Sequence, residues 1–138
     1  MIGGILFEDC PGLHADSDGD VVFHALCNAI TSVTGIPILG GIARDLCEKD
    51  GITDSQVYVE AALKTLERQE ITHVAIALEG KRPRFQDRIP EMQKKIAGVL
   101  KLRPHQIGIT ATHGDGLTDV SCGEGVYAVV CVTTMEMR

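Results

Sequence analysis

The sequence lacks several features that would assign it to particular classes of protein. It has no apolar run near the ~20 residues that a membrane-spanning helix needs, so we expect no membrane segment. Glu8 and Asp9 interrupt the first apolar stretch, which is not the pattern of a signal peptide. A net charge of −6 also argues against a surface that binds nucleic acid or an anionic membrane.

Paired cysteines and repeats are lacking too. The chain has five cysteines, an odd number, and no two of them are spaced as Cys-x-x-Cys. This favours a reduced, cytoplasmic setting in which most thiols are small buried hydrophobes. Without a repeat, a linker or a low-complexity stretch, the 138 residues are expected to form one domain over 1–138, and 44% apolar residues suffice for its core.

Hydrophobic periodicity predicts alternating helices and strands. We expect helices from residue 17 to about 34, at 54–69 and from 90 to about 100. We expect strands at 2–7, 73–79, 107–112 and 126–134, the last of them buried. Ser17 or Asp18 is expected to cap the first helix, with Asp20 in its first turn, and Gly35 to end it. This alternation predicts an α/β fold, a single layer of helices packed on a mixed β-sheet.

The first helix carries a polar column opposite its apolar face. At 100° per residue, Asp20, His24 and Asn28 lie on the side opposite Val22 and Leu26. Such a histidine can bind Zn²⁺ while Asp20 orients the imidazole from behind. A capped helix start with a solvated histidine explains the same residues, and the spacing alone leaves both open.

Two loops after predicted strands carry further polar groups. Thr112 ends the strand at 107–112, and His113 and Asp115 follow it. Hydroxyls and backbone amides there can bind phosphate, and Asp115 can bind Mg²⁺ or Mn²⁺. The basic loop at 80–88 follows the strand at 73–79 and can contact the phosphate or base of a nucleotide. A polar connection and a solvated charge run are the alternatives.

Together these stretches resemble the cyclodiphosphate synthase family, in particular its branch in chlamydiae. The resemblance is carried by Ser-Asp-Gly-Asp-Val-x-x-His at 17–24, Glu-Gly-Lys-Arg-Pro at 79–83 and Gly-Ile-Thr-Asp-Ser at 51–55, and it covers essentially the whole chain. It implies a homotrimer with active sites between subunits. It also implies cyclisation of 4-diphosphocytidyl-2-C-methyl-D-erythritol 2-phosphate to 2-C-methyl-D-erythritol 2,4-cyclodiphosphate with release of CMP, a step of non-mevalonate isoprenoid precursor synthesis.

The resemblance also implies the functional residues. His24 matches a zinc ligand and Asp115 a ligand of a second metal, Mg²⁺ or Mn²⁺. The implied catalytic residues are Asp16, Ser17 and His113. The implied contacts to the substrate, a cytidine diphosphate derivative, are Ser17, Leu39, Gly40, Pro83, Arg84, Ala111, Thr112, His113 and Asp115.

One departure from the family pattern bears on activity. The family's zinc site also uses an Asp-x-His pair on a strand upstream of the Ile-Gly-Gly stretch, which here stands at residues 2–4, so we expect the zinc site of this chain to be incomplete. A catalytically impaired trimer that binds cytidine nucleotides is therefore the alternative to an active synthase. An unrelated α/β trimer of interaction type is a third hypothesis. The expected location is the cytoplasm, or the plastid stroma in a plant-type host.

Overall fold

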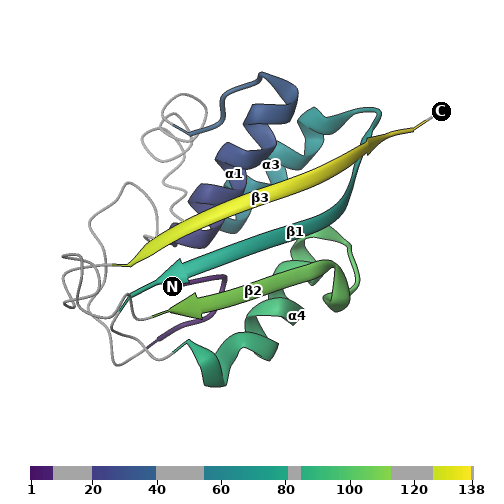
Figure 1. Ribbon diagram of the computed structural model, residues 1–138. Coiled ribbons are helices and arrows are strands. Elements are labelled where there is room, and N and C mark those ends of the chain that lie inside the picture. Colours follow the sequence, from purple (N-terminus) through teal and green to yellow (C-terminus); the bar gives the residue numbers. More distant parts are fainter. Residues whose placement is uncertain (8–19, 40–54, 81–84, 113–125, 138) are drawn as a thin grey trace.

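The described residues form one β-sheet with their helices on a single face. The structure, a computed structural model, describes residues 1–7, 20–39, 55–80, 85–112 and 126–137. These contain α1 (Val21–Thr34), α3 (Ser55–Leu63), β1 (Gln69–Glu79), α4 (Ile89–Leu100), β2 (Ile107–Thr112) and β3 (Tyr127–Glu136). The strand order is β2-β1-β3, with β1 parallel to β2 and antiparallel to β3. Figure 1 shows α1, α3 and α4 on one side of this sheet, which confirms the predicted α/β layer.

The helices pack on the sheet through the apolar stripes that their periodicity predicted. In α4, where Pro90 stands in the first turn, the apolar residues at helical spacing are all buried: Met92, Ile96, Val99 and Leu100. In α1 Val22 and Leu26 of the predicted apolar face are buried, and so is Ile30 one turn later, whereas Val33, at the end of the helix, is 36% exposed. Within the described residues no helix is long and apolar enough to cross a bilayer.

The N-terminal residues form a tight turn where we expected a strand. Ile2 and Ile5 exchange two backbone hydrogen bonds, of 2.9 and 3.1 Å. Between them Gly3 and Gly4 have φ values of 60° and 77°, a left-handed conformation that glycine adopts without steric cost. The predicted strand at 2–7 is therefore wrong, because the chain reverses direction at Gly3 and Gly4.

Helix α1 begins later than predicted, and at a different cap. Asp20 is its N-cap, with a side chain that accepts hydrogen bonds from the backbone N–H groups of Val22 and Phe23. The predicted caps, Ser17 and Asp18, lie outside the described residues. The predicted end is confirmed, since Gly35 takes a left-handed conformation (φ 75°) and donates its N–H to the Thr31 carbonyl at 2.7 Å.

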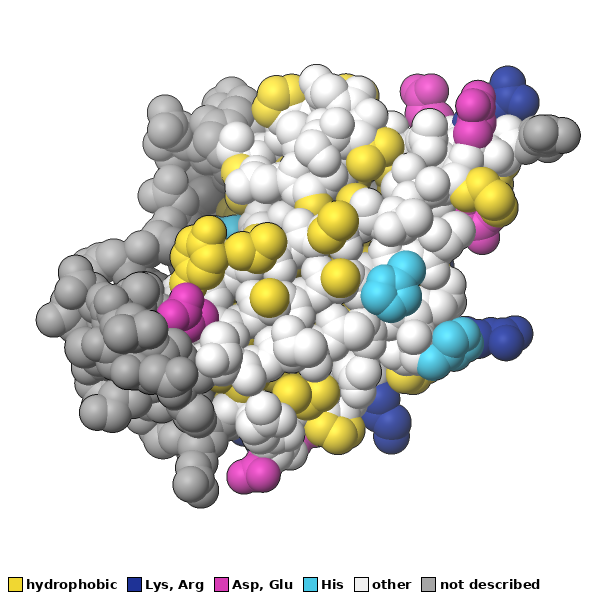
Figure 2. Space-filling view, viewed as in Figure 1, with side chains coloured by type: hydrophobic (Ala, Val, Ile, Leu, Met, Phe, Trp, Pro, Cys, Tyr) yellow, Lys and Arg dark blue, Asp and Glu magenta, His cyan; other side chains and the backbone are white. Residues whose placement is uncertain are grey.

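Strand β3 is half-buried on one side and exposed on the other, which corrects the prediction of a buried strand. Its residues alternate between half-buried positions, against the helices, and exposed positions on the other side. The exposed positions include Tyr127 (55% exposed) and Val129 (49%). The exposed Cys131 and Val129 pair with Ala75 and Ala77 of β1, which are exposed on the same side. We call this surface the open sheet face, and Figure 2 shows hydrophobic side chains gathered on it.

Candidate active site

One edge of the sheet gathers the described parts of the candidate site. Because β1 and β2 are parallel, both end there: Glu79 is in register with Thr112, and the Gly80 N–H donates to the Thr112 carbonyl at 3.1 Å. Strand β3 starts at the same edge, with Tyr127 paired to Glu79 (Figure 1). The basic loop and the loop that begins with His113 therefore leave the sheet from adjacent backbone positions. Ligands of open α/β sheets bind at this kind of edge.

A second set of contacts joins the segment before residue 8 to the segment after residue 84. The rings of Phe7 and Phe85 meet edge to face, with centroids 5.8 Å apart, and both side chains are buried. The Gln86 side chain donates to the carbonyl of Ala111 at 3.4 Å, near the end of β2. The contact of Phe7 with Phe85 and this hydrogen bond hold residue 7, residues 85–86 and the end of β2 close together. Each of these segments adjoins a stretch that carries predicted site residues.

Arg88 fixes this junction. Its guanidinium lies 4.8 Å from the ring centroid of Phe7 and donates to the carbonyl of Leu6 at 3.2 Å. It also makes two hydrogen bonds to the Glu91 carboxylate, of 2.9 and 3.1 Å, which lower the pKa of Glu91. The sequence predicts Arg88 in the basic loop that contacts a nucleotide, whereas in the structure its guanidinium bonds to Leu6 and Glu91 of the protein itself.

The structure places four of the predicted site residues. Ala111 is half-buried and Thr112 exposed at the carboxyl end of β2, where the sequence predicted them. Leu39 is half-buried and packs against the hydrophobic core. His24 is half-buried on α1. The other predicted site residues lie outside the described part of the chain: Asp16, Ser17, Gly40, Pro83, Arg84, His113 and Asp115.

Asp20 has a structural role that the sequence did not reveal. Its carboxylate is fully buried, where the helical projection had put it in an exposed polar column. It accepts hydrogen bonds from the backbone N–H groups of Gly3 at 2.9 Å and Gly4 at 2.7 Å, besides those of Val22 and Phe23, both at 3.1 Å. One carboxylate thus ties the N-terminal turn to the first turn of the helix that carries His24. The Gly3-Gly4 pair, whose backbone amides need a hydrogen-bond acceptor, is the sequence signal that could have indicated this role.

The described residues alone do not form a metal site. Residues 1–7, 20–39, 55–80, 85–112 and 126–137 contain no cluster of three His, Cys, Asp or Glu side chains able to hold a metal ion. His24 lies one helical turn after Asp20, and its backbone N–H donates to the Asp20 carbonyl at 3.0 Å. The imidazole is thus carried on a well-anchored helical turn and supplies one ligand at most.

Comparison with known proteins identifies the family of this chain. The sequence model of the YgbB family matches residues 1–135. The 2-C-methyl-D-erythritol 2,4-cyclodiphosphate synthase of Chlamydia felis is 48% identical over 137 residues, which cover 99% of this chain and 78% of the relative.

Solved structures share the fold. The bifunctional IspDF of Campylobacter jejuni superposes with a TM-score of 0.89 at 26% identity over 99% of this chain, which spans only 38% of that longer protein. A 2C-methyl-D-erythritol-2,4-cyclodiphosphate synthase solved with CDP has a TM-score of 0.76 at 24% identity, covering 98% of this chain and 89% of its own. On the family match and the close relative, this chain belongs to the YgbB family, the family of the 2-C-methyl-D-erythritol 2,4-cyclodiphosphate synthases.

Proposed function

We propose that this protein converts 4-diphosphocytidyl-2-C-methyl-D-erythritol 2-phosphate into 2-C-methyl-D-erythritol 2,4-cyclodiphosphate and CMP, a lyase reaction of isoprenoid precursor synthesis. The observation that carries the proposal is the 48% identity to a synthase of this name over 99% of the chain. The sheet edge at Gly80 and Thr112 is consistent with it, since two candidate substrate loops start there.

The reaction is an internal phosphoryl transfer. An oxygen of the 2-phosphate attacks the β-phosphorus of the diphosphate, the bond from that phosphorus to the bridging oxygen breaks, and CMP leaves with the bridging oxygen. Such a reaction requires the protein to position two phosphates and to neutralise their charge, without a covalent nucleophile. The proposed catalytic residues are Asp16, Ser17 and His113, and the basic loop with Pro83 and Arg84 is the proposed cytidine and phosphate contact.

Metal ions are part of the proposal because the family implies a metal-dependent reaction. A divalent cation neutralises phosphate oxygens as a Lewis acid. His24 is the proposed zinc ligand within the described residues, in a zinc site that the sequence predicts to be incomplete, and Asp115 is the proposed ligand of Mg²⁺ or Mn²⁺. The helical turn that carries His24 is anchored by Asp20, which would fix the direction of the imidazole.

A homotrimer is the proposed assembly, and the open sheet face supports it. Val129 and Tyr127 are about half exposed there, beside the exposed Ala75, Ala77 and Cys131. The described helices cover only the opposite face of the sheet (Figure 1). A contiguous apolar surface of this kind typically packs against a partner, and a second and third copy of the chain are the partners that the family resemblance implies. The cytoplasm stays the predicted location.

Loss of His24 tests the proposed site. The assay measures CMP released from the native substrate with Zn²⁺ and Mg²⁺ present, and the zinc content of the same samples. The variant His24→Ala is expected to lose at least about a hundredfold in kcat together with its zinc, as when a group that orients a substrate is removed. The control Ser32→Ala changes an exposed hydroxyl elsewhere on α1 and should keep both. Full activity in His24→Ala would refute the assignment.

A further inference from the structure

The segment at residues 3–7 is fastened to the rest of the protein at two points. Near its start, two backbone N–H groups donate to the Asp20 carboxylate, at 2.9 and 2.7 Å. Near its end, the carbonyl of Leu6 accepts a hydrogen bond from the guanidinium of Arg88 at 3.2 Å. The segment therefore connects the N-cap of α1 with the residue just before α4.

Arg88 makes the second attachment with its whole guanidinium. Each of the three nitrogens donates a hydrogen bond, one to the Leu6 carbonyl and two to the Glu91 carboxylate. The guanidinium also lies 4.8 Å from the centroid of the Phe7 ring, within the range of a cation–π contact. Phe7 meets the ring of Phe85, whose carbonyl accepts the backbone N–H of Arg88 at 2.9 Å. One arginine thus joins the end of the N-terminal segment to the turn that precedes α4.

This junction stands between two stretches that carry proposed site residues. Phe7 is followed by the stretch at 8–19, with two of the proposed catalytic residues, and Phe85 follows the stretch at 81–84, with the proposed cytidine contacts. A reaction between two phosphates of one substrate depends on their relative position, and a displacement of about 1 Å can cost a hundredfold in rate. We propose that Arg88 is a positioning residue for this reaction: it fixes the points from which the two stretches extend, and it does not contact the substrate. The inference rests on the proposed function.

The variant Arg88→Gln separates positioning from nucleotide binding. We expect kcat, measured by CMP release, to fall at least about tenfold. The Kd of CMP, measured by calorimetry, should change less than about threefold, because the cytidine contacts remain and the Gln86 hydrogen bond to Ala111 still holds the adjoining turn. The thermal midpoint should fall by no more than about 4 °C, since the Arg88 and Glu91 side chains are 33% and 57% exposed. A rise in Kd as large as the fall in kcat would overturn the proposal.

The variant Arg88→Lys distinguishes positioning from a direct phosphate contact. Lysine keeps the positive charge and binds phosphate as a point charge, but it lacks the planar fork that bonds to Leu6 and Glu91 together. We therefore expect its kcat to stay within about threefold of that of Arg88→Gln. Recovery of kcat to the level of the unchanged protein would make Arg88 a substrate contact and contradict the proposal.

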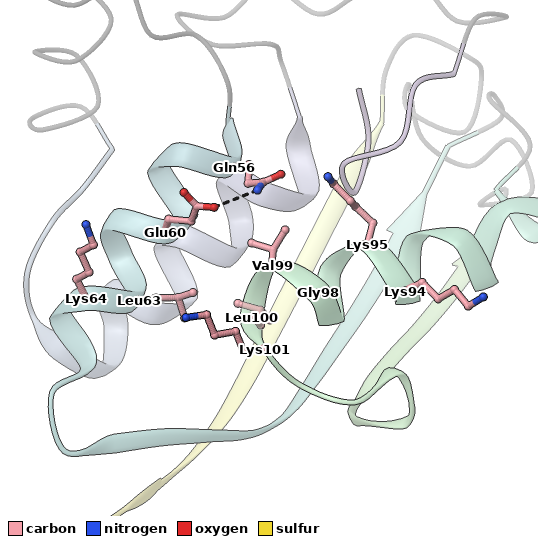
Figure 3. Close-up of a pocket in the computed structure, with 10 residues that line it drawn as sticks. All are labelled: Gln56, Glu60, Leu63, Lys64, Lys94, Lys95, Gly98, Val99, Leu100 and Lys101. Carbon is pink, nitrogen blue, oxygen red and sulfur yellow. Dashed lines mark hydrogen bonds between the residues drawn. The ribbon is translucent and has the colours of Figure 1, made fainter.

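Lys94→Gln is the matched control for the loss of a positive charge. Lys94 is an exposed residue of α4, and Figure 3 shows its side chain extending away from α3. This variant should keep both kcat and the Kd of CMP within about twofold. A fall in kcat as large as that of Arg88→Gln would attribute the effect to net charge and refute the role of the junction.

Phe7→Leu tests whether the ring and the guanidinium act together. It should lower kcat as Arg88→Gln does, and the double variant should lose little more than either single variant, because both changes break one junction. Fully additive losses would contradict a shared role.

Hydrogen exchange gives a readout that needs no turnover. The backbone N–H of Ile5, which donates to the Ile2 carbonyl at 3.1 Å, should exchange at least about fivefold faster in Arg88→Gln, because the segment has lost one of its two attachments. Unchanged exchange at Ile5 would overturn the proposal whether or not the protein converts its substrate. Absence of turnover in the unchanged protein would instead refute the proposed function.

Discussion

The Asp20 carboxylate lies 2.7 Å from the backbone nitrogen of Gly4, sixteen residues earlier in the chain. This hydrogen bond and the one to Gly3 hold the N-terminal turn against the start of α1. A Cβ atom on Gly4 would lie 3.0 Å from the ring of Phe23 and 2.6 Å from the Cγ of Lys95. The turn therefore depends on glycine both for its conformation and for its packing.

Gly4→Ala and Gly35→Ala separate these two requirements. Both glycines have nearly the same positive φ, 77° and 75°, but a Cβ on Gly35 would meet no atom within 4 Å. We expect Gly35→Ala to cost roughly 1 kcal/mol of unfolding free energy, from conformation alone. Gly4→Ala should cost about 2 kcal/mol more, because the buried Phe23 ring must move. Urea unfolding measures both, and equal costs would show that the turn is loosely packed.

Cys27 should make the stability of the fold depend on alkaline pH. Burial raises the pKa of its thiol from 9.0 to about 12. Between these values the unfolded chain ionises and the folded chain does not, so this contribution to stability is complete below pH 9 and is lost as the pH rises toward 12. At pH 10 the loss is about 1.4 kcal/mol.

The variant Cys27→Ala isolates this effect from other titrations. Urea unfolding at pH 8 and pH 10 should show a smaller drop in the variant than in the unchanged protein, by about the same 1.4 kcal/mol. An identical drop in both proteins would mean that the thiol is not protected by the fold.

Val129→Asp tests the homotrimer. An aspartate on the open sheet face would lose its solvation in an apolar interface, so the variant should become monomeric. Light scattering at micromolar concentration should give about three times the chain mass for the unchanged protein and for the control Ser32→Asp, on exposed α1 surface. Cys131, in the same face, should react with iodoacetamide faster in Val129→Asp than in the trimer. A monomeric unchanged protein would remove the basis for a shared active site.

Cytidine selectivity tests the nucleotide part of the site. Calorimetry should give CMP at least about tenfold tighter binding than UMP or AMP, because a pocket that hydrogen-bonds the edge of one base leaves polar groups unpaired with another. Thr112→Val, at the sheet edge, should weaken CMP binding, while Thr65→Val, a few residues before the start of β1 and so at the other end of that strand, should not. Equal affinity for AMP and CMP would contradict a cytidine pocket.

The sequence predicted the elements whose periodicity is local, and missed those set by distant contacts. The bounds of β2 and the buried stripe of α4 followed from the order of apolar residues. The N-terminal turn did not, because its acceptor, Asp20, stands sixteen residues from Gly4. The open sheet face was also missed, since Val129 is apolar like a core residue and the sequence does not distinguish a partner surface from an interior.

The candidate site was predicted in part. The sequence placed each of the two loops after a strand, but the meeting of Gly80 and Thr112 at one edge depends on the parallel pairing of β1 and β2, which the sequence did not predict. The contact of Phe7 with Phe85 could not be predicted either, because it joins two segments that lie far apart in the sequence. The extent of the single domain, 1–138, stays a prediction.

The most direct test is the fate of the substrate itself. Purified protein with Zn²⁺ and Mg²⁺ is incubated with 4-diphosphocytidyl-2-C-methyl-D-erythritol 2-phosphate, and ³¹P NMR follows the products. We predict equal amounts of CMP and of 2-C-methyl-D-erythritol 2,4-cyclodiphosphate, with its two coupled phosphorus signals. CMP bound without conversion, or CMP released together with a linear phosphate, would contradict the assignment as a cyclodiphosphate synthase.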